Sequence, residues 1–406
     1  MKAIQTPWQV TLAILTFNTV LMSASYTMLI PFLPMYLIEE LGVAQSDVNW
    51  WSSIIFSVTF LISGIMAPIW GAMADKNSRK LMALRAATCL AIVYFLGGLV
   101  SGPWQLFWVR VLQGFSAGLW PATLAIMSAQ APHNRLGFAM GVMQGGLTAG
   151  GVLGPLAGGL LAEYFGMRST FMIAGASLAF IAVVLAIFVA DSRPNPAQKT
   201  ATVSRPVRPN PLRLAVVQRM LFAGVVQLTI LMTQPVLPLY IAELQHSMDK
   251  IVLVSGIVFS IVGISGVIAS PAWGILGQGW GFRPALYLAL FLSGVFGVIQ
   301  ALPHDLTWFT ALRFVGGIAF AGIFPAINAV LTQSTDPADR GKVFGYSYAA
   351  QQFGSVVGPI LGAALATWFS NQVSIAAAGA LLFPVVAILY WFRPKASSAS
   401  GTPLNE

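Results

Sequence analysis

Residues 141–158 read GVMQGGLTAGGVLGPLAG, and residues 345–362 read GYSYAAQQFGSVVGPILG. Both follow the pattern G-x8-G-x3-G-P-x2-G, shifted by 204 residues from Gly141 to Gly345. Each copy lies in an apolar stretch long enough to cross a bilayer. Glycines let neighbouring membrane helices approach closely, and a proline leaves a bend that the neighbours accommodate. The predicted hinge positions are Gly150, Gly154, Pro155, Gly158, Gly354, Gly358, Pro359 and Gly362.

Shorter matches keep the same order along the chain. LPMY at 33–36 returns as LPLY at 237–240, APIWG at 67–71 as SPAWG at 270–274, and GLWPA at 118–122 as GIFPA at 322–326. A shift of about 204 residues exceeds the 20–50 residue period of a solenoid. The chain is therefore predicted to be one parallel duplication, an organisation typical of transporters that open alternately to the two sides of a membrane.

The composition excludes several classes of protein. Of 406 residues, 57% are hydrophobic and only 8% are charged, whereas soluble proteins carry roughly 25% charged residues. The single cysteine, Cys89, excludes a disulfide within the chain, and the three histidines have no metal-ligand spacing. We therefore predict a membrane protein without a metal or other cofactor, and not an enzyme, because no nucleophile–base pair lies in the apolar spans.

Apolar spans of about 20 residues or more predict an all-α membrane protein of 12 transmembrane helices in two pseudosymmetric six-helix bundles. The spans are roughly 10–38, 47–74, 81–101, 104–130, 138–163, 168–190, 214–243, 251–276, 283–302, 305–333, 342–368 and 373–393. The predicted domains are an N-terminal bundle (1–190), a proline-rich basic cytoplasmic linker (191–213), a C-terminal bundle (214–395) and a disordered cytoplasmic tail (396–406).

Loop charges predict the orientation. With the N-terminus inside, most lysines and arginines of the loops fall on the cytoplasmic side, and acidic residues dominate the other side. Both termini are therefore predicted to be cytoplasmic. We attribute the net charge of +9 to the basic residues of the cytoplasmic loops, which set the orientation of the chain in the membrane. We expect the lipid bilayer to be a partner, and we do not expect the chain to bind nucleic acid.

Three motifs together resemble the major facilitator superfamily, and within it the drug:proton antiporter branch. The first is GAMADKNSRK at 71–80, in which Ser78 replaces a glycine of the family pattern. The second is RVLQG at 110–114, and the third is the glycine–proline repeat. The resemblance covers essentially the whole chain. It implies the fold of that superfamily, a monomer in a bacterial inner membrane, and export of amphipathic drugs or toxic small molecules by proton antiport through alternating access.

The first motif places a charged cluster of Asp75, Arg79 and Lys80 at a cytoplasmic helix junction. The resemblance implies that this cluster latches a gate. The alternative is a positive-inside cluster with an incidental aspartate. In the second repeat Gln278 stands where Asp75 would recur, so a charged latch would be one-sided.

Two arginines, Arg110 and its repeat counterpart Arg313, are predicted to lie at hydrocarbon depth. A cation there costs several kcal/mol unless it is paired or lines a wet cavity. Helical spacing places Gln113 and Trp120 on the face of Arg110, and Phe320 and Asn328 on the face of Arg313. The alternative is that the arginines bond backbone carbonyls and lock helices together.

A central cavity between helices 1, 4, 7 and 10 is implied by the resemblance, with helices 5, 8 and 11 contributing. The further candidate lining residues are Asn18, Tyr26, Gln144, Gln227, Gln234, Tyr348 and Gln351. Such polar residues also commonly bond a neighbouring membrane helix. The set favours bulky amphipathic substrates, although methionine and aromatic residues are also ordinary packing material.

Carboxylates are missing from the predicted interior of helices 1 and 4, where many relatives in this branch carry one. The remaining candidates for the coupling proton are Asp75, then Glu39 and Glu243, which match each other in the repeat. Glu40 is a weaker choice because the repeat gives it no counterpart. Arginines without acidic partners also permit anionic or zwitterionic substrates.

Two alternatives to drug export therefore stay open. One is an exporter or facilitator of a small organic metabolite, anionic ones included. The other is a non-transporting membrane sensor or scaffold, which predicts no ligand-dependent flux in liposomes.

Overall fold

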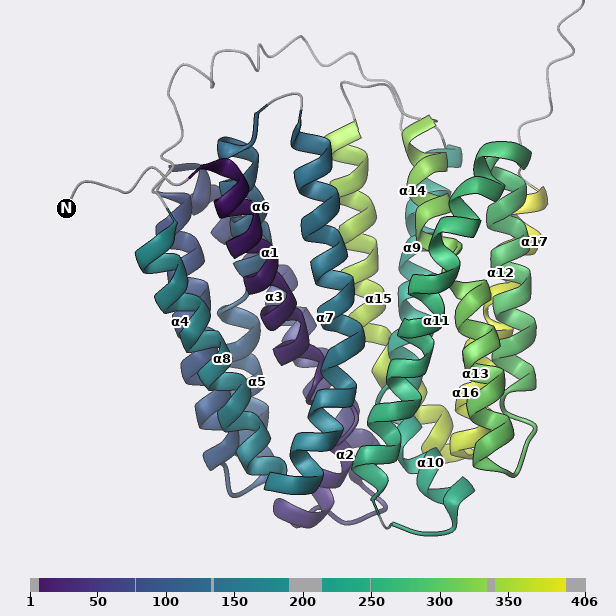
Figure 1. The fold of residues 1–406 in the computed structure, drawn as a ribbon. Helices are drawn as coiled ribbons and strands as arrows, with labels where there is room; N and C mark the ends of the chain where they lie inside the picture. The colour runs from purple at the N-terminus through teal and green to yellow at the C-terminus, as the bar shows by residue number, and fades with distance from the viewer. Residues whose placement is uncertain are drawn as a thin grey trace, which may run out of the picture.

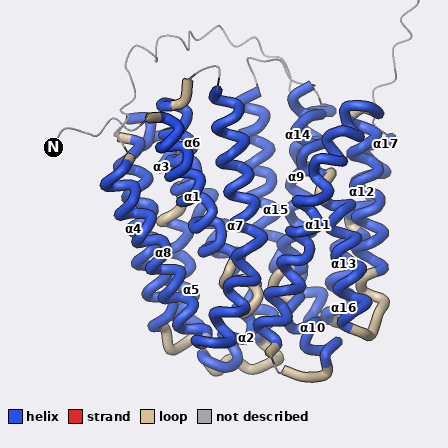
Figure 2. The backbone as a smooth tube through the Cα atoms, viewed as in Figure 1, coloured by secondary structure: helices blue, strands red, loops and turns tan. Residues whose placement is uncertain are grey.

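A computed structural model describes residues 7–76, 78–132, 135–189, 214–248, 250–333 and 340–391, and all regular structure in these ranges is helical (Figures 1 and 2). The predicted linker and tail lie outside these ranges. The first half contains α1 (Trp8–Thr27), α2 (Leu33–Met35), the π-helical turn η1 (Tyr36–Glu40), α3 (Val48–Lys76), α4 (Arg79–Leu99), α5 (Pro103–Phe115), α6 (Leu119–Gln130), α7 (Leu136–Phe165) and α8 (Met167–Phe188). The second half contains α9 (Leu214–Thr233), α10 (Leu237–Gln245), α11 (Ile251–Trp280), α12 (Phe282–Ile299), α13 (Leu306–Phe320), α14 (Ile323–Gln333), α15 (Arg340–Trp368), α16 (Asn371–Ala380) and α17 (Leu382–Trp391).

The predicted all-α membrane fold is confirmed, and the number of helices that could cross a membrane is close to the predicted twelve. In the described ranges ten helices are long and apolar enough to cross a membrane, and the pair α9–α10, bent by 43°, makes an eleventh. The remaining predicted span, 104–130, consists of the two shorter helices α5 and α6 and falls outside that set. The break between them falls at Ser116–Gly118.

The first helix is shorter than its predicted span of 10–38. It ends at Thr27, and the chain turns before α2 and η1. Pro31 and Pro34 lie in this region, and each lacks the N–H that a continuing helix would need. The prolines therefore end the first membrane helix early and start a short second one.

The glycine motif packs two helices tightly within each half. A Cβ added to Gly158 would lie against the Met28 carbonyl, and one added to Gly362 would lie against the Met232 carbonyl. The same correspondence holds for Gly150 with the Val20 carbonyl, Gly354 with Gly224, Gly154 with Ala24, and Gly358 with Leu228. The six contacts repeat at the shift of 204 residues. Helices α7 and α15 run unbroken through Pro155 and Pro359, so these glycines act in the structure as close contacts to α1 and α9.

Side-chain hydrogen bonds repeat in the same way. The Tyr36 hydroxyl donates to the Gly97 carbonyl (2.9 Å), and the Tyr240 hydroxyl donates to the Ala301 carbonyl (3.3 Å). The indole N–H groups of Trp70 and Trp273 donate to Phe115 (2.8 Å) and Ile318 (2.7 Å). The duplication thus preserves individual contacts as well as helix order.

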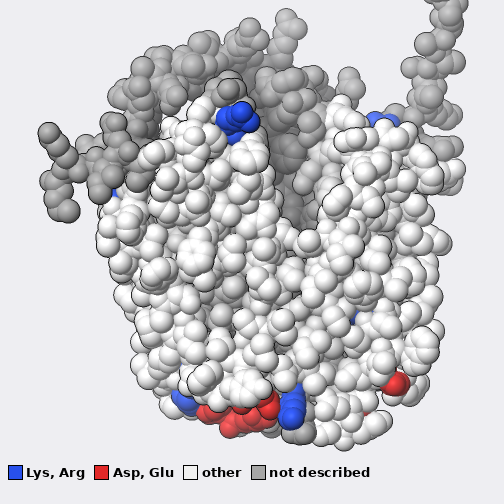
Figure 3. Space-filling model, viewed as in Figure 1, with Lys and Arg blue, Asp and Glu red and all other residues white. Residues whose placement is uncertain are grey.

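The two halves meet along α7 with α11 and along α3 with α15 (Figure 1). The Ser57 hydroxyl donates to the Val356 carbonyl (2.7 Å), and the Ser260 hydroxyl donates to the Val152 carbonyl (2.8 Å). At the end of the molecule where α1 begins, the surface is hollowed between the halves, and acidic side chains gather at the opposite end (Figure 3). The halves therefore enclose a space that opens toward one side.

Candidate functional site

A cavity of about 580 Å³ lies between the two halves. Its walls come from α1, α3, α4, the α5–α6 pair and α7 in the first half, and from α9 and α15 in the second. Seven predicted residues line it: Tyr26, Arg110, Gln113, Trp120, Gln227, Gln234 and Tyr348. The volume lies in the range of drug-sized ligand sites, about 300–1,000 Å³.

Arg110 lies deep in this cavity and is only 6% exposed. Its Nη1 donates to Gln113 Oε1 (2.9 Å), and Gln113 Nε2 donates to the Tyr94 hydroxyl (3.2 Å). Arg110 Nε has no partner among the described protein groups. A neutral amide and a phenol orient the guanidinium without neutralising it, so its positive charge remains available to a bound molecule.

Arg85 of α4 also lines the cavity, and the sequence analysis missed it. Its guanidinium carbon lies 3.6 Å from the centroid of a Trp70 ring, a cation–π geometry. Its Nη2 donates to the Ala117 carbonyl (2.9 Å). Arg85 lies six residues inside α4, so the depth argument applied to Arg110 would have found it.

The break between α5 and α6 explains why Arg85 and Trp70 meet there. Gly118 adopts φ of +114°, a left-handed conformation that favours glycine, and ends the continuity of the helix. Carbonyls at the end of α5 lose their helical partners. Trp70 and Arg85 donate to two of these carbonyls, Phe115 and Ala117. Two side chains thus stabilise the break from the cavity side.

Several predicted lining residues lie elsewhere. Asn18 is buried in α1, and its amide has no partner among the described groups. Gln144 is exposed. Gln351 donates to the Ser347 carbonyl (3.3 Å), and its neighbour Gln352 lines the cavity instead. Arg313 and Phe320 line a separate cavity inside the second half. Asn328 is exposed and lines neither cavity. The two repeated arginines therefore do not share one site.

The proposed gate cluster is only partly described. Helix α3 passes through Asp75, but the side chain of Asp75 lies outside the described part of the chain. Arg79 Nη1 donates to the Ala125 carbonyl (3.1 Å), and Lys80 Nζ donates to the Ala186 carbonyl (2.7 Å). Both basic residues thus tie α4 to other helices of the same half.

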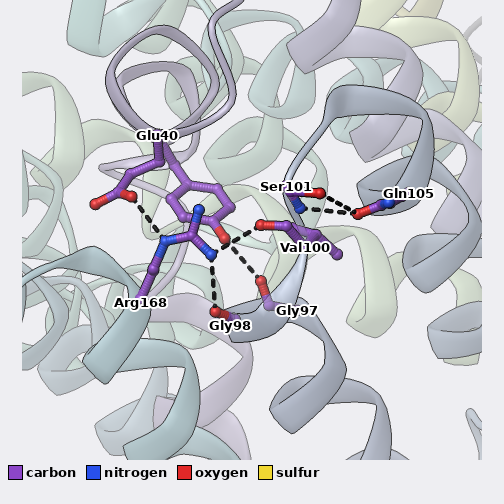
Figure 4. Close-up of polar contacts among 8 residues, drawn as sticks. Glu40, Gly97, Gly98, Val100, Ser101, Gln105 and Arg168 are labelled. Atoms are coloured by element: carbon purple, nitrogen blue, oxygen red, sulfur yellow. Dashed lines mark hydrogen bonds and ion pairs between the residues drawn. The ribbon is translucent and has the colours of Figure 1, made fainter.

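The acidic residues at the other end form a tether in each half, and Figure 4 shows the one in the first half. Glu40 Oε2 accepts from Arg168 Nε (2.7 Å), and Arg168 Nη1 also donates to the Gly98 and Val100 carbonyls (3.2 and 2.8 Å). In the second half Glu243 Oε1 accepts from Asn371 Nδ2 (2.7 Å). Both tethers join residues 128 apart in sequence. The structural counterpart of Glu243 is therefore Glu40, although the sequence repeat matched Glu243 with Glu39.

The π-helical turn η1 causes this change of partner. Tyr36 and Tyr240 correspond at a shift of 204, whereas Glu40 and Glu243 correspond at 203. A π-turn holds one residue more than an α-helical turn. Glu39 is left exposed on η1, and desolvation, followed by repulsion from Glu40, raises the pKa of its carboxyl group.

Comparison with known proteins decides the family. The model of the Major Facilitator Superfamily matches residues 15–276 and 232–406. The chain belongs to the Major Facilitator Superfamily. It is similar to the multidrug resistance protein MdtG of Proteus mirabilis (33% identical over 378 residues, 93% of this chain and 94% of the relative). It is also similar to MdtG of Klebsiella pneumoniae (31% identical over 406 residues, 98% of each chain).

Solved structures share the superfamily fold at low sequence identity. The nucleoside transporter NupG superimposes with a TM-score of 0.78 at 15% identity, covering 95% of this chain and 100% of that chain. A bacterial homologue of the human lysosomal transporter Spinster gives 0.78 at 15% identity, covering 96% and 97%. As a member of the superfamily, the chain is a multi-pass membrane transporter and not an enzyme.

The Arg168 tether offers a small-effect prediction, because the second repeat already shows its replacement. Asn371 stands at the place of Arg168, and its neighbour Gln372 donates to the Ala301 carbonyl (2.6 Å), which corresponds to the Gly98 carbonyl that Arg168 contacts. We expect Arg168→Gln to cost about 1 kcal/mol or less, since Arg168 and Glu40 are about one-third exposed and such pairs contribute little. Thermal unfolding of the purified transporter at low and high salt measures this. The prediction fails if the wild type is more stable than Arg168→Gln by several kcal/mol at both salt concentrations. That result would show that the Arg168–Glu40 pair contributes strongly to the stability of this end of the molecule.

Proposed function

We propose that this chain is a secondary active transporter that exports amphipathic drugs or toxic small molecules by proton antiport through alternating access. The observation that carries the proposal is the cavity of about 580 Å³ between two repeated halves. Its walls combine aromatic rings (Tyr26, Trp70, Trp120) with the amides of Gln227 and Gln234. Such a surface suits large molecules with both apolar and polar parts. Relatives named as multidrug resistance proteins support the same substrate class.

The orientation follows from charge. By the order of the helices, α4, α7 and α12 begin at the hollowed end, with Arg79, Lys80, Arg135 and Arg283 at or beside their first residues. Glu39 lies on η1, which follows the far end of α1, and carboxylates gather at that opposite end (Figure 3). The positive-inside rule assigns the basic side to the cytoplasm. The cavity then opens inward, ready to take substrate from the cytoplasm. We propose a monomer in a bacterial inner membrane with both termini cytoplasmic.

The coupling proton needs a carrier outside the cavity wall, since no carboxylate is among the described lining residues. Asp75 at the gate cluster is the first candidate. Glu39 is the second, because its raised pKa brings protonation closer to the working pH. Glu243 is held by Asn371 and is the third.

Flux in proteoliposomes tests the proposal. A fluorescent amphipathic drug should accumulate inside vesicles loaded at acidic pH, and the accumulation should disappear when a protonophore collapses the gradient. Asp75→Asn or Glu39→Gln should abolish this dependence if that residue carries the proton, while facilitated exchange of the drug persists. Undiminished uphill transport without a pH gradient would exclude proton antiport, and absence of any flux would favour a sensor or scaffold.

A second candidate substrate class is a small organic anion. Two guanidinium groups, Arg85 and Arg110, line the cavity, and the described lining contains no carboxylate to balance them. A buried cation without an acidic partner favours a ligand that supplies the negative charge.

A further inference from the structure

A second cavity of about 150 Å³ lies entirely within the C-terminal half. Its walls come from α9, α11, α12, α13 and α16, and its lining residues include Arg313, Ser293, Gly297, Gly316 and Gln300. Ile230 of α9 lines both this cavity and the central one. The second cavity is therefore a neighbour of the central cavity and is distinct from it.

The duplication explains why this space exists. Arg313 matches Arg110 at a shift of 203, and the buried positions of α4 and α12 match at the same shift, as in Ala86 with Ala289. At that shift Gln113 corresponds to Gly316, and Tyr94 corresponds to Gly297. In the first half these two side chains pack around Arg110 and accept or relay its hydrogen bond. In the second half both are glycines, and the volume they would fill is open.

The loss of these two side chains leaves donors unpaired. Arg313 Nε and Ser293 Oγ are buried and have no partner among the described groups, and Ser293 is only 6% exposed. The Thr229 and Thr233 hydroxyls that also line the space already donate to the Val226 and Ile230 carbonyls (2.8 and 3.0 Å). The guanidinium carbon of Arg313 lies 5.7 Å from the centroid of the Phe309 ring. Arg313 is partly buried, and the described lining of the cavity contains no carboxylate, so a negatively charged ligand would supply the acceptor that Arg313 Nε lacks.

We propose that this cavity binds a small monovalent anion, a halide or a carboxylate group, through Arg313 and Ser293. One guanidinium compensates one negative charge, and the described lining contains no second lysine or arginine. The volume accommodates an ion of this size and excludes a drug-sized molecule. The proposal concerns binding alone and holds whether or not the central cavity exports drugs.

Thermal unfolding of the full-length protein in detergent tests the site. We expect chloride and acetate to raise the unfolding temperature at constant ionic strength, relative to gluconate, whose long polar chain is too large for the pocket. Ser293→Ala should weaken the apparent chloride affinity about tenfold, since it removes a hydrogen bond to a charged ligand. Gly316→Gln should abolish the chloride effect, because the amide would occupy the cavity and pair with Arg313. Phe296 Cβ lies 3.3 Å from the added Cβ, so this substitution requires only a small shift.

Ser177→Ala is the matched control, because the Ser177 hydroxyl donates to the Ile173 carbonyl (3.0 Å) within α8, in the other half of the molecule. It should keep the full chloride response. An unfolding temperature that ignores both anions overturns the proposal. So does an anion response that is equal in wild type, Ser293→Ala and Gly316→Gln, since it would originate elsewhere on the protein.

The two possible sources of the anion give different flux results in proteoliposomes. If the site holds the carboxylate end of a transported molecule, chloride should compete with the flux of an aromatic carboxylate. If it holds a resident halide, chloride should stabilise the protein without slowing that flux. Either result, combined with a response lost in Gly316→Gln, supports binding at Arg313.

Discussion

Gly158→Ala should yield little correctly folded transporter and should lower its stability by about 1–3 kcal/mol or more. The added methyl group would lie against the Met28 carbonyl, a backbone atom that no rotamer change can move. Helices α1 and α7 would have to separate along their whole glycine face. Gly362→Ala should act in the same way on α9 and α15, through the Met232 carbonyl. Yield of monodisperse protein and its unfolding temperature measure the effect.

Gly141→Ala is the control within the same motif. Nothing lies within 4 Å of a Cβ added there, and alanine favours a helix over glycine by about 1 kcal/mol. We expect this variant to be at least as stable as the wild type. If Gly158→Ala and Gly141→Ala have the same yield and unfolding temperature, the motif does not act through close helix contact. The predicted hinge role would then be the better explanation of the motif.

Arg110→Ala should reduce transport of an anionic amphiphile by about 10- to 100-fold and transport of a neutral drug of similar size much less. The removed guanidinium is the cation of the hydrogen-bonded chain Arg110–Gln113–Tyr94, and hydrogen bonds to a charged group contribute about 1.5–3 kcal/mol. Uptake of an aromatic sulfonate and of a neutral dye into the same proteoliposomes gives the comparison. Arg110→Lys should retain part of the anion transport, because the charge remains while the fork of donors is lost.

Gln113→Leu controls for disruption of the surrounding network. It breaks the link between Arg110 and Tyr94 but keeps the positive charge. Anion transport should survive in this variant better than in Arg110→Ala. Equal losses for both substrates in Arg110→Ala would assign Arg110 a structural or conformational role and would remove the argument for anionic substrates.

The duplicated glycine motif, the membrane spans and the family were predictable because each depends on regularly spaced apolar and small residues. The same regularity misplaced Arg313. Its match to Arg110 suggested a shared cavity, but the partners of Arg110 are replaced by Gly297 and Gly316, and the two arginines lie in separate spaces. Equivalent positions in a repeat need not have equivalent surroundings.

Other differences arise from backbone details that side-chain patterns do not report. The π-turn at Tyr36–Glu40 moves the tethered carboxylate by one residue. The left-handed Gly118 divides the fourth predicted span, and Trp70 and Arg85 become important through that break. Arg85 was overlooked because it has no repeat partner: the residue at the matching shift is Leu288. Whether Asp75 latches the gate stays a prediction.

Between the halves, the Ser57 and Ser260 hydroxyls each donate a hydrogen bond to a backbone carbonyl of the other half. Each is worth about 1 kcal/mol, so their combined strength is close to the roughly 2.3 kcal/mol that a single charge gains in crossing 100 mV. The movement of one charge across a membrane potential of about 100 mV can therefore supply enough free energy to break both of these hydrogen bonds.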